Sequence, residues 1–146
     1  VGVGSYALNQ NITGDNNAAL GLNALFANTT GDDNVAIGKH ALQLNTEGHS
    51  NVGVGNMALN SNTTGQLNVA VGINALFTNQ TGRFNVAVGE SALLNSNTDR
   101  NTAVGYEALD ENTTGLRNTA IGLVDLRQNT TGEHNTAVGS GALESL

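Results

Sequence analysis

The chain is built from variations of one segment, Asn68-Val69-Ala70-Val71-Gly72-Ile73-Asn74-Ala75-Leu76. Copies start 17 residues apart, except for one interval of 16 residues between Asn85 and Asn101. The other copies begin at Asn17, Asn34, Asn51, Asn118 and Asn135, and a copy that lacks its Asn opens the chain at Val1. A fixed period of this length predicts a solenoid, in which each copy forms one coil and buries its apolar face against its neighbours.

Two positions carry large apolar residues in every copy, when each coil is numbered from its Asn. Position 9 is always Leu, and position 4 is always Val, Ile or Leu. We predict that these two columns form the interior ladder of the solenoid. Positions 2 and 4 should share one face of a strand, because side chains alternate between the two faces. The position 4 residues are Val3, Leu20, Ile37, Val54, Val71, Val88, Val104, Ile121 and Val138, and the position 9 residues run from Leu8 to Leu143.

Small residues occupy four further positions. Positions 3 and 8 are Ala or Gly in every copy except for Asp125, so the opposite wall of the coil or another chain should pack closely there. Asp125 would need solvent or a partner. Gly stands at position 5 in every copy and at position 15 in most, which indicates corners with positive φ or close backbone approach. Two corners predict two short strands per coil.

The sequence therefore predicts an all-β fold: a parallel β-solenoid, either a β-roll or a β-helix, of about nine 17-residue coils over residues 1–146. The coil after Leu93 is one residue short and lacks the second Gly. We predict an irregular corner at residues 94–100, with the interior columns undisturbed.

Composition narrows the class of function. The net charge is −7 with only five Lys and Arg, which argues against a nucleic-acid partner. There is no Cys, so a disulfide scaffold and a Cys-based metal or redox site are excluded. No apolar run approaches the roughly 20 residues of a membrane span. Without a signal peptide or an initiator Met, the chain is expected to be one repeat domain of a longer fibrous protein.

A second period of 51 residues, or three coils, is present in the variable positions. The segment 21–26 resembles 72–77, and the opening residues 1–4 resemble 52–55. Duplication of a three-coil block accounts for this pattern. A lateral contact that recurs every third coil also accounts for it, and its apolar residues are candidates for a subunit interface. These candidates are Leu22, Phe26, Ile73, Phe77 and Leu123.

Motifs for chemistry are weak, and we expect no catalytic residue, no cofactor and no metal site. His40, His49 and His134 fall at different coil positions, and Asp15, Asp32 and Asp33 lack the glycine-rich calcium-roll signature. The G-x-G segments lack the third Gly of a nucleotide site. N-x-T sequons follow from the repeat. The paired Thr residues that precede the second Gly are typical of turns, because ice-binding arrays place two Thr on the same face of one strand.

The run N-[V/T]-A-[V/I]-G-x-x-A resembles the head repeats of trimeric autotransporter adhesins, the YadA-like family. Matching copies include segments 34–38, 118–122 and 135–139. The whole unit, through A-L and N-T-T-G, also resembles the repeat shafts of phage tail-fibre proteins. The resemblance implies a left-handed parallel β-roll, three chains side by side, on a cell or virion surface. The family's head repeats are shorter than the coil of this chain.

We therefore expect a structural and adhesive module of an extracellular or virion-surface fibre, most simply a homotrimer and not an enzyme, with a host-surface receptor or glycan as a possible partner. The alternative is a ligand-binding β-solenoid, such as an ice-binding or glycan-binding protein. Neither function requires a cofactor or insertion of this segment into a membrane.

Overall fold

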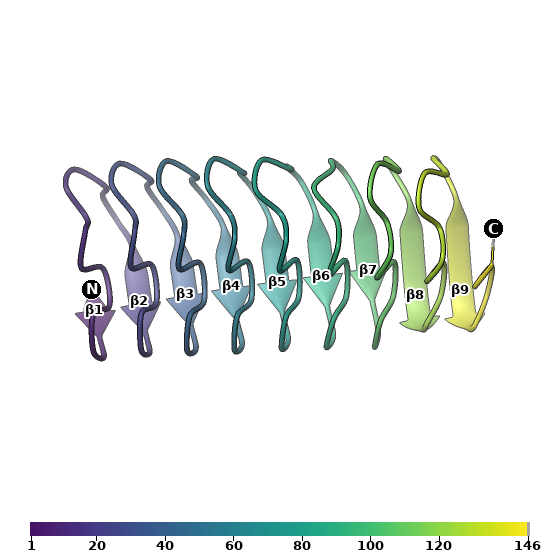
Figure 1. The fold of residues 1–146 in the computed structure, drawn as a ribbon, viewed down its shortest axis with the longest axis horizontal. Helices are drawn as coiled ribbons and strands as arrows, with labels where there is room; N and C mark the ends of the chain where they lie inside the picture. Colours follow the sequence, from purple (N-terminus) through teal and green to yellow (C-terminus); the bar gives the residue numbers. More distant parts are fainter. Residues whose placement is uncertain (146) are drawn as a thin grey trace.

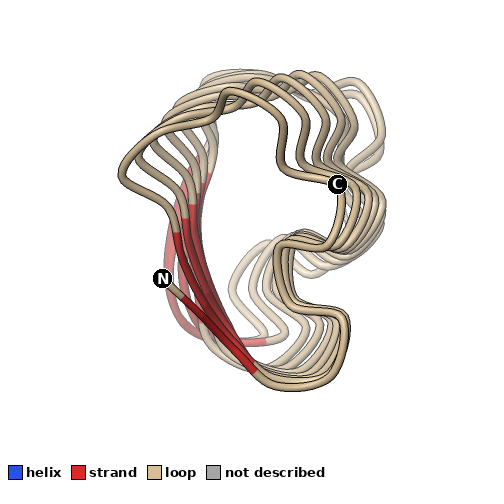
Figure 2. Ribbon diagram, turned by 90° about the vertical axis from the view of Figure 1, so that its left-hand side faces the viewer, coloured by secondary structure: helices blue, strands red, loops and turns tan. Residues whose placement is uncertain are grey.

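The chain winds into a parallel β-solenoid in the computed structural model, which describes residues 1–145 (Figure 1). Within these residues, nine strands follow one another in sequence order in a single parallel sheet. Viewed from the N-terminal end, the chain descends along the strands and returns on the opposite side as it recedes, so the winding is left-handed (Figure 2). The strands are β1 (Gly2–Val3), β2 (Ala18–Leu20), β3 (Val35–Ile37), β4 (Val52–Val54), β5 (Val69–Val71), β6 (Val86–Val88), β7 (Thr102–Val104), β8 (Thr119–Leu123) and β9 (Thr136–Ser140).

The repeat sets the register of the sheet. Gly53 pairs with Ala36 on one side and with Ala70 on the other, each 17 residues away. Hydrogen bonds between coils continue beyond the strands, as where the Leu25 N–H donates to the carbonyl oxygen of Ala41 (3.0 Å). The predicted parallel solenoid with one repeat per coil is therefore confirmed.

Each coil contains one strand, so the prediction of two strands per coil is wrong. Positions 7 and 9, on the side opposite the sheet, both have left-handed backbone, as in Asn74 (φ 57°) and Leu76 (φ 52°). Left-handed residues separated by a single residue cannot form an extended strand. This backbone conformation costs about 1–2 kcal/mol for a residue such as Leu. The complete burial of the Leu side chain at position 9 offsets that cost.

The interior contains the Leu column but not the position 4 column. Every position 9 Leu from Leu25 to Leu126 is fully buried, and the Ala residues of positions 3 and 8 pack around them. The Val and Ile side chains of positions 2 and 4 point out of the solenoid instead; Ile37 and Ile121 are about two-fifths exposed, at 41% and 42%. The predicted interior ladder is therefore correct for the position 9 column and wrong for the position 4 column.

The narrowness of the coil explains this arrangement. A methyl group added at Gly53, in position 3, would lie 3.4 Å from Leu42 Cδ1 and 3.2 Å from the carbonyl oxygen of Ala58. The interior therefore has room for one Leu and two Ala per coil, and the two β-branched residues of the strand take its outer face. The small residues at positions 3 and 8 pack against the opposite wall of their own solenoid.

Replacing Leu76 by Ala should lower the free energy of unfolding by about 2–5 kcal/mol, because it leaves a cavity in a fully buried column. Urea denaturation followed by circular dichroism measures the change. The matched control is Ile73→Ala in the same coil, whose side chain is 47% exposed. Equal losses in the two variants would contradict the assignment of position 9 to the core.

Two columns of Asn side chains run through the solenoid, at positions 1 and 12, and most of them are completely buried. In the position 12 column, Asn62 Nδ2 donates to Asn45 Oδ1 (2.7 Å) and to the carbonyl oxygen of Gly65 (3.1 Å). In the position 1 column, the Asn51 N–H donates to Asn34 Oδ1 (3.0 Å). An amide both donates and accepts, so identical side chains can stack in register and satisfy one another. The sequence analysis does not identify these two columns as part of the interior.

The two recurring Gly positions of the coil serve different purposes. Gly72, at position 5, has a φ of 141°, in a region that side chains rarely adopt. Gly65, at position 15, is not among the residues with positive φ, but a Cβ there would overlap Asn62 Oδ1. Position 5 therefore needs Gly for its backbone conformation and position 15 needs it for close approach to the Asn column.

The short coil behaves as predicted. The register is kept, because Ala87 pairs with Ala103, and Leu93 stays fully buried. Ser96 takes the place of the position 12 Asn. Asn97 Oδ1 accepts the backbone N–H of Gln80 (2.9 Å). It thus replaces the backbone carbonyl oxygen that accepts the corresponding N–H in the regular coils. The irregularity is thus confined to the corner.

Candidate functional site

The outer face of the sheet is an uncharged and mainly apolar surface that extends along the solenoid. In the strands that the structure describes, positions 2 and 4 carry only Val, Ile, Leu, Ala or Thr. The position 4 residues are partly or largely exposed, and the position 2 residues change from Val in β3–β6 to Thr in β7–β9. We name these two columns the sheet face. Extended apolar surfaces of this kind mark sites of association.

The sequence reasoning missed the sheet face because it assigned position 4 to the interior. The Ala at position 3 was the signal that could have shown which face of the strand points outward. A strand with β-branched residues on one face and only small residues on the other fits a narrow interior that already contains a Leu column.

The five predicted interface residues lie outside the two columns of the sheet face, although Leu123 is the last residue of β8. Leu22, Ile73 and Leu123 occupy position 6, just after the position 5 Gly, and are 40–52% exposed. Phe26 and Phe77 occupy position 10 and are half-buried. The structure brings Leu22 and Phe26 into one pocket, and Ile73 and Phe77 repeat their placement three coils later. Whether these residues contact another subunit stays a prediction.

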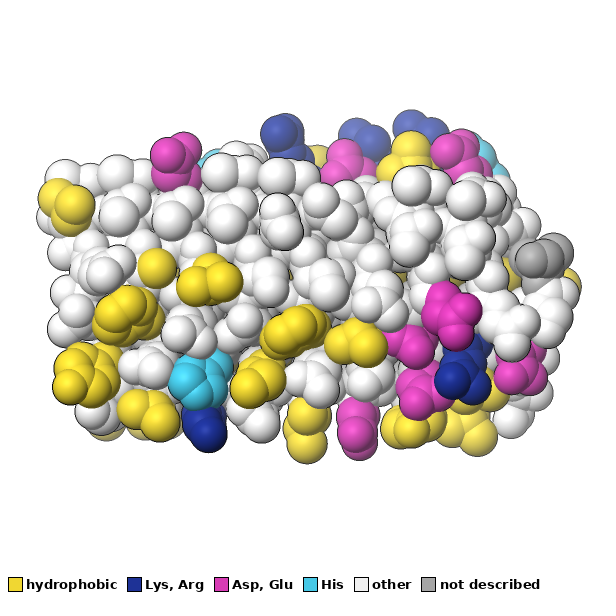
Figure 3. Space-filling model, in the orientation of Figure 1, with side chains coloured by type: hydrophobic (Ala, Val, Ile, Leu, Met, Phe, Trp, Pro, Cys, Tyr) yellow, Lys and Arg dark blue, Asp and Glu magenta, His cyan; other side chains and the backbone are white. Residues whose placement is uncertain are grey.

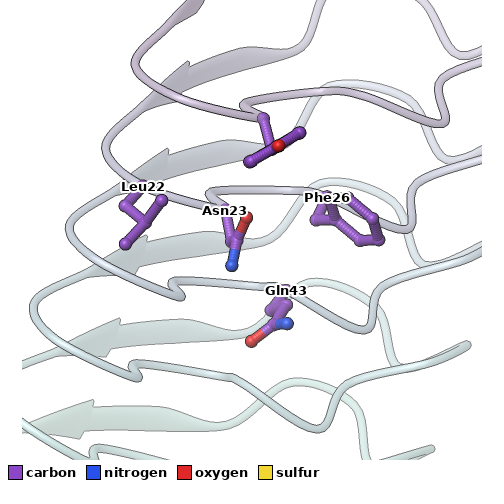
Figure 4. Close-up of a pocket in the computed structure, with 5 residues that line it drawn as sticks. Leu22, Asn23, Phe26 and Gln43 are labelled. Carbon is purple, nitrogen blue, oxygen red and sulfur yellow. The ribbon is translucent and has the colours of Figure 1, made fainter.

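A pocket of about 330 Å³ lies on the side opposite the sheet (Figure 4). Its lining comes from three successive coils: Tyr6, then Leu22, Asn23 and Phe26, then Gln43. The rings of the two aromatic residues meet edge to face, with centroids 6.4 Å apart and an interplanar angle of 75°. Sequence reasoning found two of these five residues. It could not find the others, because the pocket joins residues that the winding brings together.

Acidic side chains gather further along this side, toward the C-terminal end (Figure 3). Glu107 pairs with Arg127, with Oε2 and Nε 3.1 Å apart. Burial, reinforced by the neighbouring Glu107 carboxylate, raises the pKa of Asp110, whereas Arg127 opposes that rise. This end of the side opposite the sheet is therefore negatively charged, whereas the pocket lining contains no charged residue.

The buried Asp125, the exception at position 8, is accounted for in part. Its Oδ1 accepts the backbone N–H of Ala142 at 2.8 Å, and its side chain is fully buried. Its Oδ2 has no hydrogen-bond partner in the part of the chain that the structure describes. A backbone group of the next coil is therefore the partner that the sequence analysis required.

The remaining candidate motifs are the metal-ligating residue types, the Thr pairs and the N-x-T sequons. Among residues 1–145, no group of three or more His, Cys, Asp or Glu side chains could hold a metal ion. The hydroxyl group of Thr29 donates to the carbonyl oxygen of Thr46 (2.9 Å), so the Thr pairs stabilise the turns. The sequon residue Asn62 is completely buried, and its amide is bonded within the position 12 column.

A search for a membrane-crossing element finds none among the described residues, in which there is no helix of sufficient length and apolarity. Comparisons of the chain with protein-family models, with curated proteins and with solved structures find no match.

Proposed function

We propose that this chain is the elongated module of an extracellular or virion-surface fibre, in which copies associate side by side through the sheet face, most simply as a homotrimer. The observation that carries the proposal is the exposure of uncharged, mainly Val and Ile columns along the solenoid. The module is structural and adhesive: it extends a fibre, and it presents the side opposite the sheet to a host surface.

A second copy of the chain is the partner that best fits this face. A surface that repeats at the strand spacing of about 4.8 Å is matched in register by another solenoid with the same coil. Cyclic symmetry closes such an assembly, because every copy has the same surroundings and can turn its sheet face toward the common axis, where it is covered by its neighbours. The resemblance to trimeric adhesin repeats favours three copies over two.

The mass of the particle in solution tests the proposal, measured by light scattering after size-exclusion chromatography. We expect about three times the 14.9 kDa of one chain. Val71→Lys should reduce this mass to that of a monomer, because it places a charge in the interface, while the far-ultraviolet spectrum stays unchanged since Val71 is already 37% exposed.

The matched control is Ile73→Lys, two residues away in the same coil and also exposed. This residue belongs to the interface predicted from the 51-residue period. Loss of association in Ile73→Lys but not in Val71→Lys would move the interface to position 6. A monodisperse monomer of the unaltered chain would count against the trimer.

Binding to ice is a second candidate function, favoured by one observation. In β7–β9 the outer face carries Thr and a β-branched residue with one residue between them, as in Thr102 and Val104. This spacing places both side chains on the same face of one strand. Thermal hysteresis of the chain, and its loss in Thr119→Lys, would support this function; absence of hysteresis would remove it.

A further inference from the structure

We propose that the pocket beside Phe26 binds a neutral saccharide, as a site distinct from the sheet face. Its volume of about 330 Å³ and its lining of two aromatic rings, one Leu and two primary amides are typical of a small-molecule site, which commonly occupies about 300–1,000 Å³. The shape and lining of the pocket are independent of the association proposed above.

The apolar part of the pocket suits the C–H face of a sugar ring. Phe26 and Tyr6 meet edge to face, which fixes the orientation of both rings. Leu22 lies across the pocket from Phe26 (Figure 4). A pyranose has an apolar face and a rim of hydroxyl groups, so it can pack against a ring while its rim reaches polar groups.

The two amides are held in place by neighbouring side chains. Asn60 Nδ2 donates to Gln43 Oε1 (3.3 Å), so the NH₂ group of Gln43 can serve as a donor to a ligand. Asn23 Nδ2 lies 3.4 Å from the ring Nδ1 of His40, so the Asn23 oxygen can serve as an acceptor. A hydroxyl group both donates and accepts, and it therefore matches such a pair.

The backbone around the pocket argues against a peptide that binds by strand addition. The Ala27 N–H donates to the carbonyl oxygen of Gln43 (2.9 Å), and the carbonyl oxygen of Phe26 accepts the N–H of Gln10 (3.0 Å). These groups are used between coils, whereas strand addition needs unpaired groups at a sheet edge. Recognition at this pocket must therefore rely on side chains, which favours a saccharide.

The charge distribution argues for a neutral ligand. None of the five lining residues is charged. The chain has a net charge of −7, and Glu107 and Asp110 lie further along the same side. An anionic polysaccharide that extends from the pocket toward this acidic end would be repelled there, whereas a neutral chain would not.

Tyrosine fluorescence tests the proposal, because the chain has only two Tyr residues and Tyr6 lines the pocket. In a Tyr106→Phe background, the probes are neutral hexasaccharides of glucose, mannose and N-acetylglucosamine, with a hyaluronan hexasaccharide and decaproline as comparisons. We expect at least one neutral probe to bind. Phe26→Ala and Gln43→Ala should each weaken that binding about tenfold, whereas Phe84→Ala should leave it unchanged.

Phe84 is a suitable control because it is an exposed Phe whose ring contacts Arg100, away from the pocket. Thermal unfolding of each variant verifies that the solenoid is intact. Equal weakening in Phe26→Ala and Phe84→Ala would overturn the site. Binding of decaproline or hyaluronan alone, or of none of the probes, would overturn the neutral saccharide as its ligand.

Discussion

Replacing Gly72 by Val is expected to prevent the chain from folding. Gly72 directly follows β5 and has a φ of 141°, and a Cβ at this position would overlap the carbonyl oxygen of Gly89 in the next coil. That oxygen belongs to the backbone of an identical corner, so it cannot move without shifting the stack. The combined strain and overlap should remove most of the about 5–15 kcal/mol by which native proteins are stable. Far-ultraviolet circular dichroism and urea denaturation should show no cooperative transition.

The control for this variant is Gly53→Ala, at position 3. Gly53 is not among the residues with positive φ, and other coils have Ala at the same position. We expect its stability to lie within about 1 kcal/mol of that of the unaltered chain. A cooperative transition with an unchanged midpoint in Gly72→Val would refute the requirement for Gly at the strand end.

The period of the sequence was sufficient to predict the strand register, the Leu core and the intact columns of the short coil. Each of these follows from counting positions. Counting does not decide which face of a strand points into the solenoid, because positions 2, 3 and 4 are all apolar in most coils. Hydrophobicity favoured Val71 over Ala70 for the interior, whereas the limited width of the coil decided in favour of Ala70.

Two other features were beyond prediction from residue type. Leu is not a residue that signals left-handed backbone, yet Leu76 adopts it in a coil whose path requires it. The pocket depends on the contact between Tyr6 and Phe26, from adjacent coils, with Gln43 from the third. Only the rise and twist of the winding determine such contacts, and the repeat pattern contains neither.

The buried Asn columns should give the second large effect on stability. Asn62 donates to Asn45 and to Gly65, and its Oδ1 accepts from Asn79 Nδ2 at 3.0 Å. Asn62→Ala removes these three hydrogen bonds and leaves the buried Asn45 Oδ1 without a partner, whereas the Gly65 carbonyl oxygen still accepts from Asn51 Nδ2 and Asn79 Nδ2 still donates to Gly82. Since one unsatisfied buried acceptor costs about 1–3 kcal/mol and each of the other two lost hydrogen bonds about 0.5–1.5 kcal/mol, the free energy of unfolding should fall by about 2–6 kcal/mol, measured by urea denaturation. Asn56→Ala, an exposed Asn in the same coil, should be close to neutral.

The column also predicts an order of effects along the chain. Asn79 Oδ1 has no partner within residues 1–145, because Ser96 stands where the next Asn would donate to it. Asn79→Ala therefore removes only the two bonds that Asn79 donates, to Asn62 and to Gly82. Its loss of stability should be smaller than that of Asn62→Ala. If the two variants lose the same stability, or if both match Asn56→Ala, the stacked amides do not hold the coils together. The Asn columns would then fill space in the interior without stabilising it through their hydrogen bonds.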